Sequence, residues 1–255
     1  MNKFFGTAVM AATLAVSGAA LADEQMTQQR AIDARAVKIK LGGIVDLRVK
    51  QGPTPSLTII GDRRLVEKVS VVQDGETITI DTESRGINFG NKSRGELRVE
   101  LTMPALTQLV SNGVGASDVK GFTGPEIKVS LEGAGAVNLD SNYRSIVARL
   151  GGVGSMTLNA TDADQVDLKL GGAGAIAVNG SSKLLRAQLG GVGSLDAKKL
   201  MADTVVLDMS GLGGATVYAK TTANLKLSGL GSATVYGKPA TRTSEARGLG
   251  SVSWQ

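Results

Sequence analysis

The stretch IVARLGGVGSMTL, residues 146–158, contains the pattern that decides the fold, and this pattern recurs along the chain. Its Gly-x-Gly centre occurs eight times, with the first glycine at Gly113, Gly133, Gly152, Gly172, Gly191, Gly211, Gly229 and Gly248. The steps between copies are 20, 19, 20, 19, 20, 18 and 19 residues. A period this short is too small for a two-helix repeat, so each copy is predicted to form one rung of a stacked solenoid.

Apolar residues occupy every second position before most of the glycine pairs, as Ile146, Ala148 and Leu150 do before Gly152. Such alternation is typical of β-strands. After the pair the alternation resumes with its parity shifted, so a corner is predicted between two strands. Glycine suits this corner because it lets neighbouring backbones approach closely. The residue between the two glycines is always Val, Ala or Leu, and we expect it to point inward at the bend.

Polar, turn-forming stretches at 140–142, 159–162 and 179–182 predict a second, looser corner in each rung. One rung alone is not stable, because about five aliphatic side chains at ~1.5–3 kcal/mol each do not offset the ordering of ~19 residues at ~1.5 kcal/mol each. The predicted fold is therefore all-β. It is a single-stranded parallel β-helix of about eight rungs of 19–20 residues, with an N-terminal β-rich cap.

Three segments are predicted along the chain. Residues 1–22 have the charged start, short apolar run and Ala20-Leu21-Ala22 exit of a secretory signal peptide, and the run lacks the ~20 apolar residues of a membrane span. Residues 23–35 are predicted to be a flexible leader. Residues 36–255 form the β-helix domain, with irregular N-terminal rungs and the cap in 36–110 and the regular Gly-x-Gly rungs in 111–255.

Local signals refine the cap region. Asp74-Gly75 between two strand-like runs predicts a hairpin. Asp62 is placed to cap one short helical turn that starts at Arg63. A polar, glycine-rich loop at 84–95 includes Ile87 and Phe89, which either tuck under the end of the solenoid or form a contact site.

Composition excludes several function classes. The chain has neither His nor Cys, so Ser-His-Asp and Cys-His nucleophilic chemistry are absent. The formal net charge of +5 is spread along the sequence and only 3% of residues are aromatic, which argues against nucleic-acid binding. The Gly-x-Gly pairs are followed by strand patterns, whereas a phosphate cradle needs a helix N-terminus, so no nucleotide cofactor is expected.

Metal binding and catalysis are not expected either. The position five residues after each first glycine holds only two carboxylates in eight copies, Asp118 and Asp196, which is no ligand ladder. The nearest candidates for polysaccharide cleavage are Asp118, Asp140, Asp162 and Asp164, and they fall 5, 7, 10 and 12 residues after their own glycines. We therefore expect these four not to share a face, and no catalytic residue is assigned.

A ligand-binding patch is predicted where two Thr-x-Tyr runs occur in neighbouring rungs. Thr216 should stack on Thr234 and Tyr218 on Tyr236, with Lys220 and Lys238 beside them. Paired tyrosine faces stack well on carbohydrate. Cross-strand packing is the alternative role for the same four residues.

The chain resembles the bacterial family described as "putative auto-transporter adhesin, head GIN domain". The matching pieces are GIVDLRVKQG at 43–52, LTIIGD at 57–62, DGETITI at 74–80, MPAL at 103–106 and SNGVGASDV at 111–119, in this order. The resemblance implies a β-helix and export, and it supplies no catalytic residues. Only Gln255 follows Trp254, so no translocating barrel is expected and the expected location is periplasmic or secreted.

The predicted function is that of an exported, non-enzymatic, adhesin-like module that binds envelope or extracellular carbohydrate or protein. The mature chain is expected to be a monomer with no membrane span, and its partner to be a polysaccharide or another envelope protein. Two alternatives remain open. One is a polysaccharide-modifying enzyme, and the other is a structural or assembly protein of the cell envelope.

Overall fold

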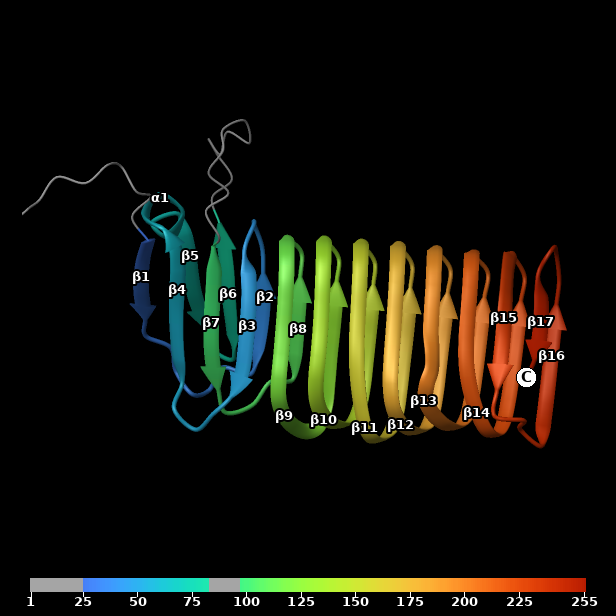
Figure 1. Ribbon diagram of the computed structural model, residues 1–255. Coiled ribbons are helices and arrows are strands. Elements are labelled where there is room, and N and C mark those ends of the chain that lie inside the picture. Colours follow the sequence, from blue (N-terminus) through green and yellow to red (C-terminus); the bar gives the residue numbers. More distant parts are fainter. Residues whose placement is uncertain (1–24, 83–96) are drawn as a thin grey trace, which may run out of the picture.

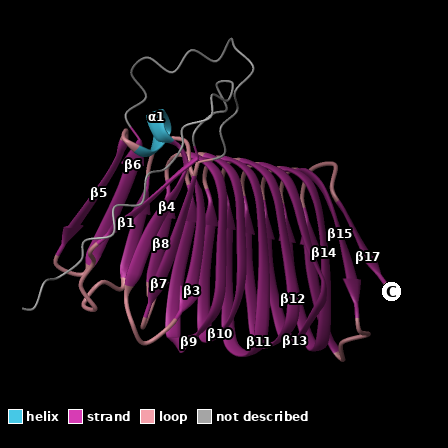
Figure 2. Ribbon diagram, turned by 60° about the vertical axis from the view of Figure 1, so that its left-hand side comes forward, coloured by secondary structure: helices cyan, strands magenta, loops and turns pink. Residues whose placement is uncertain are grey.

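The computed structural model describes residues 25–82 and 97–255. The predicted signal peptide and the loop at 84–95 lie outside these residues. The predicted fold is confirmed: strands make up 77% and helix 2%, and the chain winds into a parallel β-solenoid of about seven turns, close to the expected eight rungs. All strands of the described residues belong to one 17-stranded sheet. Figure 1 shows the rungs side by side in one row, and Figure 2 shows them wound into a coil.

In 25–82 and 97–111, the described part of the N-terminal region, there are eight strands and one short helix. They are β1 Gln25–Arg30, β2 Lys38–Leu41, β3 Asp46–Gln51, β4 Ser56–Asp62, α1 Arg63–Val66, β5 Val69–Asp74, β6 Thr77–Thr82, β7 Arg98–Met103 and β8 Gln108–Ser111. The regular region follows with β9 Val114–Leu131, β10 Ala134–Leu150, β11 Val153–Leu170, β12 Ala173–Leu189, β13 Val192–Met209 and β14 Leu212–Leu227. The last rungs are β15 Leu230–Tyr236, β16 Thr241–Ala246 and β17 Ser251–Trp254.

Each long strand pairs in parallel with the next, and the register matches the sequence repeat. Gly135 pairs with Gly154, and Gly154 pairs with Gly174. Residues that are equivalent in the repeat therefore stack directly on one another. The aliphatic side chains predicted to face inward form columns in the core, as at Leu150, Leu170 and Leu189, which are 4% exposed or less.

The tight corner at each Gly-x-Gly pair differs from the expectation in one respect. The residue between the glycines points outward, as Val153 does with 62% of its surface exposed. The reason is the close approach of successive rungs at this bend. A Cβ built on Gly154 or on Gly174 would overlap the carbonyl oxygen of the equivalent glycine in the rung before. The stacking of the rungs therefore requires glycine on both sides of the middle residue, and the middle residue takes the outer side of the bend.

The second, looser corner appears as irregularities within the long strands. The parallel register shifts between Ser141 and Ser145 and again between Ala160 and Ala163. Asp162 has φ 54° here, a left-handed conformation that Asp adopts more readily than most residues. The strands bend at these points without breaking the ladder.

The N-terminal region closes the first end of the solenoid, as predicted. β7 pairs in parallel with β3 and antiparallel with β4, and β1 then pairs antiparallel with β4. The structure differs here from the expected flexible leader, because residues 25–30 of that segment form β1. The hairpin at Gly75 and the helical turn capped by Asp62, whose side chain accepts a hydrogen bond from Arg64 N at 2.8 Å, are confirmed.

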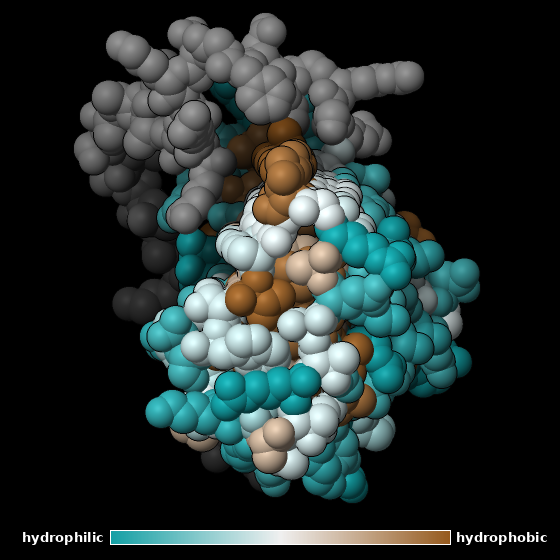
Figure 3. Space-filling view, turned by 90° about the vertical axis from the view of Figure 1, so that its right-hand side faces the viewer, coloured by the Kyte–Doolittle hydropathy of each residue, from teal (hydrophilic) through white to brown (hydrophobic). Residues whose placement is uncertain are grey.

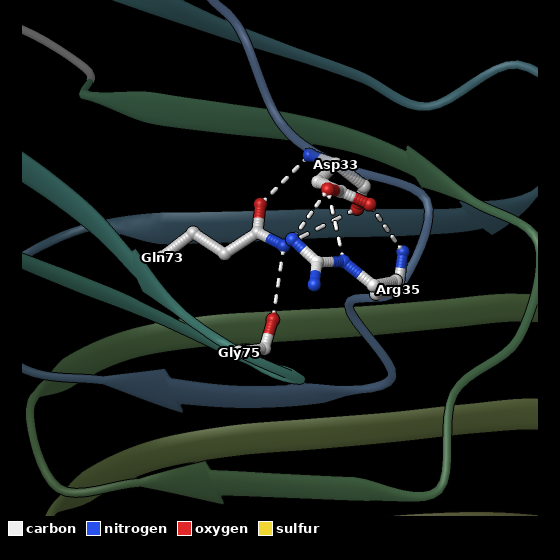
Figure 4. Close-up of polar contacts among 4 residues, drawn as sticks. All are labelled: Asp33, Arg35, Gln73 and Gly75. Carbon is white, nitrogen blue, oxygen red and sulfur yellow. Dashed lines mark hydrogen bonds and ion pairs between the residues drawn. The ribbon is translucent and has the colours of Figure 1, made fainter.

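A polar clasp ties the link between β1 and β2 to the hairpin (Figure 4). Gln73 accepts a hydrogen bond from Asp33 N at 2.7 Å and donates to Gly75 O at 3.1 Å. Arg35 donates to the Asp33 carboxylate through Nε at 3.0 Å and pairs with it through a terminal guanidinium nitrogen at 2.8 Å. The hydrogen bond from the Arg35 side chain holds the pKa of Asp33 below its usual value. This clasp fixes the first strand against the cap.

The C-terminal end is closed less completely. Every residue of β16 is exposed, including Arg242, Ser244 and Ala246 at the positions that are buried in earlier rungs. Trp254 is partly buried and packs against the end of the core, and the Arg242 guanidinium lies 5.5 Å from the centre of its ring.

Candidate functional site

One face of the solenoid follows the tight corner and is lined by two outward columns. We call it the post-corner face, and define it by the residues five and seven positions after each first glycine. The first column is Asp118, Asn138, Thr157, Ala177, Asp196, Thr216 and Thr234, and the second is Lys120, Asp140, Asn159, Asn179, Lys198, Tyr218 and Tyr236. Side chains between them point into the core, because successive residues of a strand face opposite sides.

The predicted Thr and Tyr stacks lie at the C-terminal end of this face. Thr216 pairs with Thr234 and Tyr218 with Tyr236 between β14 and β15. All four side chains are partly exposed. The register predicted from the sequence is therefore present, and the two aromatic rings occupy neighbouring rungs about 4.8 Å apart.

The cations around the tyrosines are arranged differently from the prediction. Lys198 on β13 lies with Nζ 4.2 Å from the centre of the Tyr236 ring, within cation–π range. Lys220 instead pairs with Asp203 at 3.1 Å. Lys238 is exposed and has φ 52°. The sequence did not single out Lys198, because the two-rung reach of its side chain cannot be read from the repeat.

The middle of the face is lined by amide and hydroxyl groups. Asn179 donates from Nδ2 to Asn159 Oδ1 at 3.1 Å, and Asn138 donates to Asp118 Oδ1 at 2.8 Å. These in-register contacts hold the side chains in a row on a flat sheet. Such groups can both donate and accept hydrogen bonds, as a polyhydroxylated ligand requires.

The N-terminal end of the face holds a hollow of about 610 Å³. It lies where the post-corner face continues from β9 onto β3, β7 and β4. Arg48 lies between Asp118 and Glu100 in the ladder, and Lys50 lies next to Lys120. Further lining residues are Ser56, Thr58 and Thr102. This volume is in the range of ordinary ligand sites, about 300–1,000 Å³.

The hollow contains more positive than negative charge. Its lining includes three cations, Arg48, Lys50 and Lys120, and two carboxylates, Asp118 and Glu100. Within the described residues no ion pair closer than 4.0 Å engages these three cations. Their charges are available to a ligand with carboxylate, sulfate or phosphate groups. The sequence did not indicate this site, since its residues come from four strands far apart in the chain.

The structure also tests the expectation about the acidic residues. Of these four residues, Asp118 and Asp140 share a face, in the neighbouring rungs β9 and β10, which the sequence did not predict. The reason is that residues five and seven positions after the first glycine are two apart on one strand and therefore point to the same side. Asp162 and Asp164 lie at the second bend, where Asp164 pairs with Arg144 at 2.7 Å and Lys183 at 2.6 Å. Across residues 25–82 and 97–255, no group of three or more carboxylates is placed to hold a metal ion.

The chain belongs to the family described as "putative auto-transporter adhesin, head GIN domain", whose sequence profile matches residues 37–239. A search of curated proteins found no match. In the part of the chain that the structure describes, no helix is long and apolar enough to cross a membrane.

Several solved structures share this architecture. A "putative adhesin" from Parabacteroides distasonis aligns with a TM-score of 0.77 at 20% identity, covering 91% of this chain and 97% of its own. A "putative adhesin" from Parabacteroides merdae gives 0.76 at 17% identity, with coverages of 91% and 96%. A "putative lipid binding protein" from Parabacteroides distasonis gives 0.72 at 22% identity, with the same coverages. At these identities the likeness establishes the fold.

Proposed function

We propose that this chain is an exported, non-enzymatic binding module whose post-corner face binds acidic carbohydrate of the envelope or the extracellular space. The observation on which this rests is the continuity of that face. A cationic hollow lies at one end and the Tyr218 and Tyr236 pair, with Lys198, at the other. The two columns between them consist mainly of Asn, Thr and Asp side chains.

The dimensions suit a polymer rather than a single sugar. From β9 to β15 there are six inter-strand steps, so Lys120 and Tyr236 are separated by about 29 Å along the axis. A polymer that spans this length would combine several weak contacts along one flat surface. The cations would provide attraction that falls with ionic strength, and the aromatic rings would provide contacts that do not.

The adhesin description of the family supports a binding role. The secretory pattern of residues 1–22 supports export. The relative described as lipid binding raises a lipid as another ligand. Charged and hydroxyl side chains dominate the hollow, and this favours a polar ligand over a lipid.

Retention on immobilised acidic polysaccharide, such as a polyuronate, tests the proposal, with a neutral glucan as the comparison resin. The purified protein is expected to elute from the acidic resin later than from the neutral one. Tyr218→Ala with Tyr236→Ala, and separately Lys50→Gln with Lys120→Gln, should each reduce retention. Lys169→Gln with Lys226→Gln is the matched control, because both lysines are exposed three positions before a first glycine, on the opposite side of the corner. Equal elution of all variants would contradict the proposal.

A polysaccharide-modifying enzyme is the second candidate, and one observation favours it. Asp118 and Glu100 flank Arg48 in the same hollow, which brings carboxylates and a cation together on one face. Carboxylates can act as general acids and bases in sugar cleavage. Release of new reducing ends or unsaturated sugars from a polyuronate, lost in Glu100→Gln, would support this function over simple binding.

A further inference from the structure

The outward residues of the tight corner form a continuous apolar ridge. We call it the corner ridge, and it consists of Val114, Ala134, Val153, Ala173, Val192, Leu212, Leu230 and Leu249. All eight are exposed, and the valines and leucines range from 46% at Leu212 to 86% at Leu249. Figure 3 looks along the axis from the C-terminal end, and a brown ridge recedes at the top of the described surface.

The ridge is regular because its members stack in the ladder. Val153 pairs with Ala173, Ala173 with Val192, and Leu212 with Leu230. The pairing of Ser232 with Ser251 places Leu249 next in line. Seven steps give a row about 34 Å long.

The flanks of the ridge contain almost no charge. In the five central copies, 151–155, 171–175, 190–194, 210–214 and 228–232, every residue is Gly, Ala, Ser, Val or Leu. Five extended residues around the bend make a strip about 16 Å wide. An axis at the fifth copy of the repeat overlaps two such strips over six steps, about 29 Å, so each presents about 460 Å² and the pair about 920 Å², the size of a weak, reversible interface. An apolar patch of this extent is as large as the largest one on a typical monomer, and such patches often mark an interaction site.

We propose that two copies of this chain associate through the corner ridge, antiparallel to each other, about a two-fold axis at Val192. The sequence led to the expectation of a monomer and, separately, of inward-pointing side chains at these eight positions, whereas the structure places the eight side chains outside. A second copy has the same rung spacing, so the two ridges stay in step from Ala134 to Leu249, and Val114 lies beyond the contact.

Side-chain sizes favour the antiparallel arrangement. With the axis at Val192, Ala173 faces Leu212 of the other copy, Ala134 faces Leu249, and Val153 faces Leu230. Both alanines thus meet leucines, while Val192 meets its own copy, and this fills the space more evenly. A parallel arrangement in register would place Ala on Ala and Leu on Leu, and would leave gaps beside bulges.

Charges at the two ends favour the same register. Within the strip, the residue before the first glycine is charged at only two places, Glu132 in the second copy of the repeat and Arg247 in the eighth. These copies are equally far from the fifth, which contains Val192. A two-fold axis across the ridge brings the same flank of each copy together, so Glu132 of each copy faces Arg247 of the other. Both side chains are exposed. Glu132 pairs with Arg149 at 3.1 Å, and Arg247 pairs with Glu245 at 2.5 Å.

This symmetry has a consequence for binding. Because the same flanks meet, the post-corner faces of the two copies lie on the same side of the dimer. Their sites would then be presented together to one surface or polymer. Two linked sites bind a repeating ligand more tightly than either site alone.

Sedimentation velocity over a concentration series, with no polysaccharide present, tests the association independently of any ligand. The unmodified protein should show a reversible monomer–dimer equilibrium. Val192→Lys places two like charges at the axis and should raise the dissociation constant at least tenfold. Val72→Lys is the matched control, since Val72 is 56% exposed and Val192 is 57% exposed, and it should leave the equilibrium unchanged.

The register is tested by a charge exchange. Glu132→Arg alone should weaken the dimer, and Glu132→Arg combined with Arg247→Glu should restore it. Circular dichroism should confirm that all variants are folded, as expected for exposed positions. The proposal is overturned if the protein stays monomeric up to about 1 mM, if Val192→Lys dimerises as well as the unmodified protein, or if the double exchange fails to restore association. Monomeric protein that instead binds neutral phosphatidylcholine vesicles through Val192 would also overturn it, in favour of a lipid surface.

Discussion

Substitution of Gly172 by Ala tests the close approach of rungs at the tight corner. A Cβ at this position would overlap the carbonyl oxygens of Gly152 and Gly151, inside the 3.0 Å limit that real Cβ atoms respect. To make room, the rungs must move apart by about 1 Å, against the packing of a dense interior. Two ladder hydrogen bonds are then strained, Ala173 N to Gly152 O at 3.0 Å and Gly172 N to Leu150 O at 3.1 Å.

The expected cost of Gly172→Ala is about 3–5 kcal/mol. Loss of two hydrogen bonds contributes about 1 kcal/mol each, and overpacking adds about 1–3 kcal/mol. Gly171→Ala is the control, because a Cβ there meets nothing within 4 Å and its φ is not positive. That change should be neutral or stabilise by up to about 1 kcal/mol. Urea unfolding followed by far-ultraviolet circular dichroism measures both, and similar midpoints for the two variants would refute the steric explanation.

Three further predictions concern other contacts. Tyr143 is buried, burial raises the pKa of its hydroxyl, and the hydroxyl donates to Leu106 O at 2.5 Å, so Tyr143→Phe should lower stability by about 1–2 kcal/mol in urea unfolding. Hydrogen bonds from Lys183 and Arg144 lower the pKa of Asp164 in the folded protein. Its contribution to folding stability is therefore present above the unfolded-state pKa and is lost as the pH falls through the folded-state pKa. The small difference in urea midpoint between the unmodified protein and Asp164→Asn at pH 7 should disappear well below pH 3.8. Trp254 is the only tryptophan and packs on the end of the core, so its fluorescence should change at lower urea than the circular dichroism signal, because terminal rungs have one neighbour; coincident curves would contradict fraying at this end.

The repeat predicted most of the fold. A fixed period and an alternation of apolar residues determine which side chains stack inside, and the buried columns at Leu150 and Leu170 follow from them directly. The pairing of Tyr218 with Tyr236 also followed, since equal steps in sequence become neighbours in a solenoid. Local turn signals were sufficient for the Asp74-Gly75 hairpin and the Asp62 cap.

Two features were not accessible from the sequence, for different physical reasons. The outward position of Val192 and its equivalents depends on how closely backbones approach at the corner, and apolar character alone favours the inside. The hollow at Arg48 and Lys50 depends on the order of β4, β7, β3 and β9, in which one strand is antiparallel and sequence neighbours are not spatial neighbours. Irregular connections of this kind leave no period to follow.

Lysine acetylation footprinting with bound acidic polysaccharide tests the central proposal about the post-corner face most directly. Lys50, Lys120 and Lys198 lie on this face, whereas Lys169 and Lys226 are exposed on the opposite side of the corner. The account predicts slower acetylation of the first three lysines when the polymer is added, with no change at the other two. Equal protection of both sets, or protection of Lys169 and Lys226 alone, would contradict it.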